Sequence, residues 1–268
     1  MGKPSWREEA WESFLIKFWD ERQKGSDSVE YTTKDLEPFL SRYGKSGQGE
    51  IRIFHYGCGR VEALKKRNLT KIPLSHSSWK LIPRSGEIIF PEPGEGILFF
   101  PKNKMTDGMI AGIKDAMERS ANPGETTFLT IANHSGIISD FYDLKNQGTL
   151  FTGGRQRAGI HLVLGCHDID MTKAQIEIDG GFEWTDTVVI AEMKSSFKQD
   201  HFDINQALIP MLKWKQLLKN KRVYSLVLLA EINSKGIEYW MYDLDHVKTK
   251  LGNSMRIVKS KKYMIEVK

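Results

Sequence analysis

The sequence contains very little cysteine. Only Cys58 and Cys166 carry thiols among its 268 residues. Two cysteines exclude a disulfide framework and a four-thiolate zinc site, and they favour a reducing compartment. No stretch approaches the roughly 18 consecutive apolar residues that a membrane-spanning helix requires, and the first residues lack the apolar core of a signal peptide. We therefore expect a cytoplasmic protein without membrane association.

Several nucleotide-binding and hydrolase motifs are also missing. Gly44-Lys45-Ser46 ends like a phosphate-binding loop, but Phe39 stands where that motif requires glycine. Gly57-Cys58-Gly59 begins a dinucleotide pattern that fails at Glu62. The sequence has neither a Gly-x-Ser-x-Gly elbow nor a His-Glu-x-x-His motif. We expect no nucleotide cofactor, no hydrolase triad and no zinc protease.

The positive charge is concentrated in two places, although the net charge is only +5. From Lys248 onward, seven cations face one anion, Glu266. Between Arg60 and Lys71, five cations face Glu62. Such clusters suit a polyanion partner, because each phosphate contact releases counterions. Solvated surface charge is the alternative interpretation.

The length suits two modest domains. The densest turn signal is Pro-Glu-Pro-Gly-Glu-Gly at 91–96, which predicts an N-terminal module over 1–96 and a second domain over 97–268. Hydrophobic spacing in the module predicts a helix over 6–22, a short helix from 33, a strand over 50–55 and a helix over 61–68. A strand, a turn and a second strand are expected over 79–90. This helix-plus-hairpin order is compatible with a winged-helix-like DNA-recognition module.

The second domain predicts an α/β fold with a mixed sheet flanked by helices. Helical spacing occurs at 105–117, 137–144 and 204–218. Extended segments are expected at 161–166, 175–179 and 187–192, before the last of these helices, and at 224–232 and 237–242 after it.

The chemistry-bearing residues lie on two of these segments. In a strand over 188–194 the period of two places Glu192 and Lys194 on one face. Burying two charges is costly unless they face a cleft or an ion. Asp179 ends the preceding segment, just before an expected turn at Gly180-Gly181. A short connection between neighbouring strands would bring Asp179 to Glu192.

Two such carboxylates suit a hydrated Mg²⁺ ion that also coordinates a substrate phosphate. Lys194 would then orient the attacking water and offset the charge that grows on phosphorus. A structural salt bridge between Glu192 and Lys194 is the alternative interpretation.

At these positions the sequence resembles the PD-(D/E)xK nuclease superfamily, whose core is a helix, a three-stranded meander carrying the acids, a helix and a further strand. Asp179 matches the first acid, and Glu192-Met193-Lys194 matches the E-x-K element, although Ile178 replaces the proline. The match covers about 137–232. The wider context, Gln175 to Glu183 with Gln206 and Pro210 beyond, looks like one group of type II restriction endonucleases.

The resemblance implies a restriction-endonuclease-like core and a Mg²⁺-dependent enzyme that cuts double-stranded DNA at a short specific sequence and leaves 5′-phosphate ends. Asp179, Glu192 and Lys194 would be catalytic, with Asp179 and Glu192 as metal ligands. A homodimer would match a palindromic site, and the basic C-terminal tail would grip the DNA backbone. A repair or recombination nuclease of the same fold without sequence specificity, and a non-catalytic DNA-binding regulator, remain alternatives.

Further candidates surround this centre. Glu177, Glu183 and Gln206 are candidate supporting residues, and they can equally be surface or outer carboxylates and a solvent-facing amide. Asp140 or Asp143, on the preceding helix, is a candidate further acid.

A loop carrying Arg155, Gln156 and Arg157 is the candidate DNA-binding segment, because arginine and glutamine pair with guanine and adenine edges in the major groove. Phosphate clamps or solvated arginines are the alternative. Asn133-His134, Arg60 and the Lys65–Arg67 cluster are weaker DNA-contact candidates.

Overall fold

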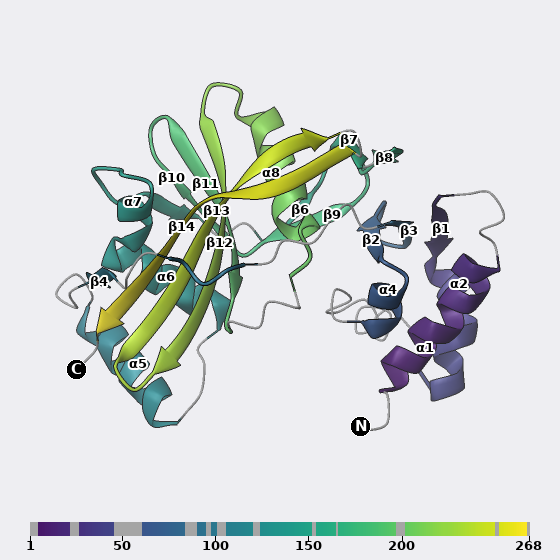
Figure 1. The fold of residues 1–268 in the computed structure, drawn as a ribbon, viewed down its shortest axis with the longest axis horizontal. Helices are drawn as coiled ribbons and strands as arrows, with labels where there is room; N and C mark the ends of the chain where they lie inside the picture. Colours follow the sequence, from purple (N-terminus) through teal and green to yellow (C-terminus); the bar gives the residue numbers. More distant parts are fainter. Residues whose placement is uncertain are drawn as a thin grey trace.

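The computed structural model describes residues 5–21, 27–45, 61–83, 90–94, 98–100, 106–119, 124–151, 154–164, 166–196, 202–249 and 252–266. Figure 1 shows a small N-terminal unit, in purple and blue, beside a larger body built around a long twisted sheet. No helix within these ranges is long and apolar enough to cross a membrane.

The N-terminal unit combines short helices with a three-stranded antiparallel sheet of order β1-β3-β2. Its elements are α1 (Trp6–Leu15), the π-helical turn η1 (Ile16–Asp20), β1 (Val29–Thr32), α2 (Thr33–Leu40), the 3-10 turn η2 (Ser41–Tyr43), α4 (Glu62–Lys66), β2 (Leu69–Pro73) and β3 (Ser78–Pro83). Local sequence starts the helices: Ser5 caps α1, and Thr32 with Asp35 forms a capping box at α2. One aromatic-rich core, which includes Trp11, Phe14 and Tyr31, holds the unit together.

The helical predictions here are confirmed, whereas β2 is not predicted. The sequence over β2 is short and ends in Pro73, a pattern that argues against a strand. β3 confirms the strand expected at 79 and pairs with both β1 and β2. The expected strand at 50–55 and the far half of the expected hairpin lie outside the described residues.

Arg67 is a structural residue. Its guanidinium donates to Asp20 at 2.7 Å and to Glu12 at 2.8 Å, which ties the end of α4 to α1 and η1. The hydrogen bond from Arg67 lowers the pKa of Glu12. The charge of Arg67 is therefore balanced within the unit, and its contact with DNA stays a prediction.

The larger body contains a seven-stranded sheet of order β4-β14-β13-β12-β11-β10-β5. In that order the strands are β4 (Leu98–Phe100), β14 (Gly252–Glu266), β13 (Gly236–Thr249), β12 (Arg222–Asn233), β11 (Thr187–Lys194), β10 (Gly180–Glu183) and β5 (Thr149–Phe151). β11 is parallel to β12, and β4 is parallel to β14; the other neighbours are antiparallel. The mixed α/β class is confirmed.

Helices cover both faces of this sheet (Figure 1). One face packs against α5 (Asp107–Glu118), α6 (Glu125–Ser135) and α7 (Ile137–Phe141), and the other packs against α8 (Asn205–Leu217), which connects β11 to β12. Val189, Ala191 and Met193 of β11 face the first group of helices, whereas Val188 and Ile190 pack with Trp214 of α8. The expected period of two in this strand is confirmed.

Two hairpin-like ribbons lie outside the main sheet. β6 (Gly154–Arg157) pairs with β9 (Gln175–Ile178), and β7 (His161–Leu164) pairs with β8 (His167–Asp170). We expected the segment at 161–166 to form the first strand of the meander. It lies instead outside the main sheet, where β5 is the neighbour of β10. Sequence alternation marked the longer apolar run and passed over the three residues of β5.

The expected basic tail is instead the long strand β14, which lies next to the edge strand β4. Its cations are paired within the fold: Lys259 with Asp143 at 3.0 Å, Lys261 with Asp140 at 3.5 Å, and Lys262 with Glu92 and Glu238, each at 2.9 Å. Each of these three lysines is therefore paired with an acid from another part of the sequence. The description of this segment as a tail is wrong, and its contact with the DNA backbone stays a prediction.

One buried acid of the sheet titrates unusually. Asp243 of β13 is 7% exposed and accepts a hydrogen bond from the Tyr142 hydroxyl at 3.1 Å. Burial raises the pKa of Asp243 to about 6 from the ordinary 3.8. The protonated form is favoured by folding, so its stabilisation is present below pH 3.8 and is lost as the pH rises through 6.

Asp243→Asn should remove this dependence on pH. The free energy of unfolding of the variant, relative to wild type, should increase by up to about 3 kcal/mol between pH 4 and pH 7, from roughly 1.4 kcal/mol per pKa unit. Urea unfolding at each pH measures this difference. A difference that stays constant across the range would mean that Asp243 titrates normally.

Candidate functional site

The register of two neighbouring strands brings the predicted acids together. β10 pairs with β11 so that Gly180 faces Ala191 and Gly181 faces Ile190. The next residues beyond this ladder are Asp179 and Glu192, so the pairing brings Asp179 to the end of β11 where Glu192 lies. Asp179 lies at the bend where the chain leaves the β6–β9 ribbon and enters the main sheet.

Gly180 and Gly181 are strand residues, not the expected turn. A Cβ on Gly181 would lie 2.3 Å from the ring Cζ of Phe151 on β5, and one on Gly180 would lie 3.1 Å from Cδ1 of Leu129 on α6. The two glycines therefore let β10 pack closely against β5 and α6. Their small size, rather than a turn, sets the entry of Asp179 into the sheet.

Four side chains gather at this end of β11, three of them linked through Lys194 and the fourth, Asp179, held by a backbone N–H. The Met193 backbone N–H donates to Asp179 Oδ2 at 2.7 Å, and Lys194 Nζ donates to Glu192 Oε1 at 2.5 Å. Lys194 Nζ also lies 3.9 Å from Glu125 Oε1 at the start of α6. Glu192 is 5% exposed, whereas Asp179 and Lys194 are half-buried, so the cluster reaches the surface through these two side chains.

Burial dominates the electrostatics of the cluster. It raises the pKa of Glu192 to about 8, against the opposing charge of Lys194. Burial also raises the pKa of Asp179. Burial alone would lower the pKa of Lys194, but Glu192 and Asp179 outweigh it and raise that pKa. The cluster therefore retains protons to unusually high pH.

The donor set at this centre consists of two carboxylates and is suited to a hard divalent cation. Mg²⁺ is commonly held by one or two carboxylates and completes its shell with water and phosphate oxygens. Asp179 is already oriented by the Met193 N–H, and it is accessible. Across the described ranges, no group of three or more histidine, cysteine or acidic side chains is arranged to hold a metal. The residues fit a cation shared with substrate better than an all-protein metal cage.

The candidate supporting acids differ in position. Glu177 is exposed on β9, and its charge contributes to the raised pKa of Asp179, so it lies near the centre. Glu183 ends β10 and pairs with Lys221, roughly 13 Å along the strand from Asp179 at about 3.3 Å per residue. The prediction of Glu183 as a supporting residue is wrong, because it depended on a turn at Gly180-Gly181.

Gln206 is exposed in the first turn of α8, and its role as a supporting residue stays a prediction. Asp140 accepts from the Tyr263 hydroxyl at 2.8 Å, and Asp143 pairs with Lys259. Neither aspartate reaches the centre, so the predictions of a further acid at these positions are wrong.

The acid that does approach from the preceding helices is Glu125, which sequence patterns did not identify. The Thr-rich sequence of α6 hides its helical period, and an acid in the first turn of a helix has an ordinary explanation in the helix dipole. Asn-Pro-Gly before Glu125 was the available signal, because it marks a chain reversal followed by a helix start.

The candidate DNA-binding segment is a strand rather than a loop. Arg155 faces Glu177 and Gln156 faces Ile176 in the antiparallel β6–β9 ribbon, which leads into Asp179. The side chains of Arg155, Gln156 and Arg157 lie outside the described part of the structure. Asn133 is only 7% exposed, so its prediction as a DNA contact is wrong.

The fold and this centre define a mixed α/β protein with a carboxylate–lysine cluster at the end of a central strand. Residues 102–264 match the family described as Domain of unknown function (DUF6997). The match covers more than half of the chain, so the protein belongs to this family. The matched region contains Asp179, Glu192, Lys194 and Glu125, and it excludes the N-terminal unit. No curated protein and no solved structure matches the chain.

The unusual carboxyl predicts a direct spectroscopic result. In protein labelled at glutamate side-chain carbons, one carboxyl resonance should titrate near pH 8, because burial disfavours the charged form of Glu192. That resonance should be absent from Glu192→Gln. A wild-type spectrum in which every glutamate titrates below pH 6 would contradict the described burial.

Proposed function

We propose that this protein is a Mg²⁺-dependent endodeoxyribonuclease of the PD-(D/E)xK type that cuts double-stranded DNA at a short specific sequence. One observation carries the proposal. The β10–β11 pairing brings the Asp179 carboxylate to the Met193 N–H, directly after Glu192 in the chain, and Lys194 donates to Glu192 from the same strand face.

The order of elements around the centre supports the proposal. Helices α6 and α7 precede a meander of β5, β10 and β11, after which α8 crosses to the parallel strand β12. This order is compatible with the helix, three-stranded meander, helix and strand that the resemblance implies, with β6 to β9 inserted between β5 and β10. Asp179 enters the second strand of the meander, and Glu192 and Lys194 end the third.

The chain's own residues would divide the work at the scissile phosphate. Asp179 and Glu192 would hold the cation, and the Met193 N–H would keep the Asp179 carboxylate in place. Bound there, Mg²⁺ would supply Lewis acidity to the phosphoryl oxygen and to the attacking water. Lys194 would orient that water and offset charge on the phosphoryl group, while hydrolysis leaves 5′-phosphate ends.

The N-terminal unit supports a DNA partner. It runs helix, strand, helix, helix, strand, strand, with the sheet order β1-β3-β2, which is compatible with a winged-helix-like reader. In the proposed enzyme this unit and the β6 segment read the sequence, in the cytoplasm. A homodimer would cut both strands of a palindromic site, because its two-fold symmetry matches that of the DNA.

One observation favours a second candidate, a non-catalytic DNA-binding regulator. The Glu192–Lys194 pair is closed at 2.5 Å and largely buried, as a structural ion pair would be. Such a pair persists without any function in catalysis. Activity measurements distinguish the two candidates.

A plasmid digest should give discrete bands in Mg²⁺ and none in EDTA. Asp179→Asn, Glu192→Gln and Lys194→Met should each lower the cleavage rate by at least about 100-fold, because each removes a group that stabilises charge in the transition state. Glu118→Gln, on the exposed surface of α5, is the matched control and should cut like wild type.

Each alternative has its own outcome. A smear in Mg²⁺ would indicate a nuclease without sequence specificity. Binding of DNA without cleavage would indicate the regulator. Full cleavage by Lys194→Met would place the reaction centre elsewhere.

A further inference from the structure

A buried polar contact joins the N-terminal unit to the start of α8. The Thr70 hydroxyl on β2 donates to Asp203 Oδ2 at 3.3 Å and accepts from Asn205 Nδ2 at 3.2 Å. Asn205 Nδ2 also donates to Asp203 Oδ1 at 3.0 Å. Thr70 is 5% exposed and Asn205 is 7% exposed. We call these three residues the Thr70–Asp203–Asn205 bridge.

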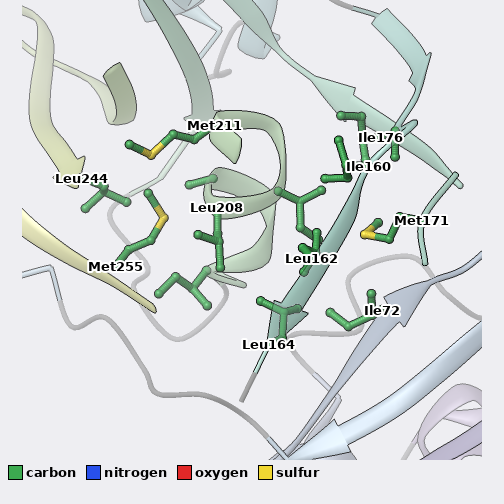
Figure 2. Close-up of a cluster of buried hydrophobic side chains, with 14 of the residues drawn as sticks. Ile72, Ile160, Leu162, Leu164, Met171, Ile176, Leu208, Met211, Leu244 and Met255 are labelled. Carbon is green, nitrogen blue, oxygen red and sulfur yellow. The ribbon is translucent and has the colours of Figure 1, made fainter. Parts of the chain in front are cut away.

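Apolar packing surrounds the bridge and extends to both sides of the reaction centre. Ile72 of β2 and Ile82 of β3 belong to the same buried cluster as Ile176 of β9 and Leu208 of α8. Figure 2 shows Ile72 and Ile176 toward one side of this cluster and Leu208 near its middle. β9 runs directly into Asp179, and α8 follows Lys194 in the chain. The N-terminal unit therefore packs on the elements that precede and follow the three central residues.

The composition of the bridge indicates a role in alignment. Its two bonds to Thr70 are long for hydrogen bonds, and the buried Asn205 Oδ1 has no hydrogen-bond partner among the described residues. Apolar side chains of similar size at the bridge would be buried at a lower free-energy cost, because an unpaired buried acceptor is unfavourable. Directional polar groups fix one relative position of two surfaces, which apolar packing alone specifies less sharply.

Resting on the proposed nuclease function, we propose that Thr70 is a positioning residue through which docking of the N-terminal unit aligns the reaction centre. The hydroxyl fixes Asp203 and Asn205 at the first turn of α8. That turn packs in the same cluster as β9, so the two elements that lead to and from the centre share one anchor. DNA held by the N-terminal unit would thereby be held in a fixed position relative to Asp179 and Glu192.

Three variants test this role. Thr70→Val keeps the shape of the side chain and removes the hydroxyl, whereas Thr70→Ser restores the hydroxyl. Thr187→Val is the matched control: Thr187 is fully buried at the far end of β11, and its hydroxyl makes one bond, to Asp186 at 2.9 Å. Both valine variants lose a buried hydroxyl, and each should lower the melting temperature by no more than about 5 °C.

Single-turnover cleavage in Mg²⁺ and DNA binding in Ca²⁺ measure catalysis and binding separately. Thr70→Val should cut about tenfold more slowly than wild type with unchanged DNA affinity, and Thr70→Ser should restore the rate. Thr187→Val should cut normally. Equal rates for Thr70→Val and wild type, or an equal loss in both valine variants, would overturn the proposal.

Hydrogen exchange keeps this test separate from that of the nuclease function. Amides of residues 187–194 and 203–208 should exchange about tenfold faster in Thr70→Val than in wild type, with or without DNA. If wild type does not cut DNA, the proposed nuclease function fails, and the exchange result still decides whether the bridge aligns these segments. Faster exchange confined to β2 would show that the bridge transmits nothing to the centre.

Discussion

The pairing of β10 with β11 is the constraint on which the candidate centre depends. A shift of one residue would move Asp179 away from Glu192 and turn the alternate side chains to the opposite face. The shift is opposed because Val189, Ala191 and Met193 are buried against one layer of helices while Val188 and Ile190 are buried against α8. The glycine pair at the start of β10 permits the close packing against Phe151 and Leu129 that this register requires.

The same arrangement accounts for the electrostatics of the centre. Glu192 lies near the end of a strand that is buried on both faces, so burial removes its carboxyl from water. The charge of Lys194 lowers the pKa of Glu192, and the charge of Glu125 raises it, while burial has the largest effect. A cation bound to the two carboxylates would replace the protons that the cluster otherwise retains, because metal binding requires the deprotonated ligands.

Charge that is concentrated in the sequence is dispersed in the fold. The lysines of β14 pair with acids on α7, just after it and on strand β13, while Arg67 joins α4 to α1 and η1. Clustered cations along a chain are therefore weak evidence for a polyanion surface, since long-range ion pairs are invisible in sequence. In the proposed nuclease, DNA contacts depend more on the N-terminal unit and the β6–β9 ribbon than on the C-terminal strand.

The sequence by itself determined the alternation of β11, the helix α8 and the grouping of Asp179, Glu192 and Lys194, because strand parity and helical period are local properties. It did not determine that β5 rather than 161–166 begins the meander, or that Gly180-Gly181 is strand, because a short strand is identified only by its neighbours. Tertiary structure also decided that Glu125 approaches Lys194 while Asp140, Asp143 and Glu183 do not. The physical reason is that register and layer packing, which join residues far apart in the chain, choose which charges meet.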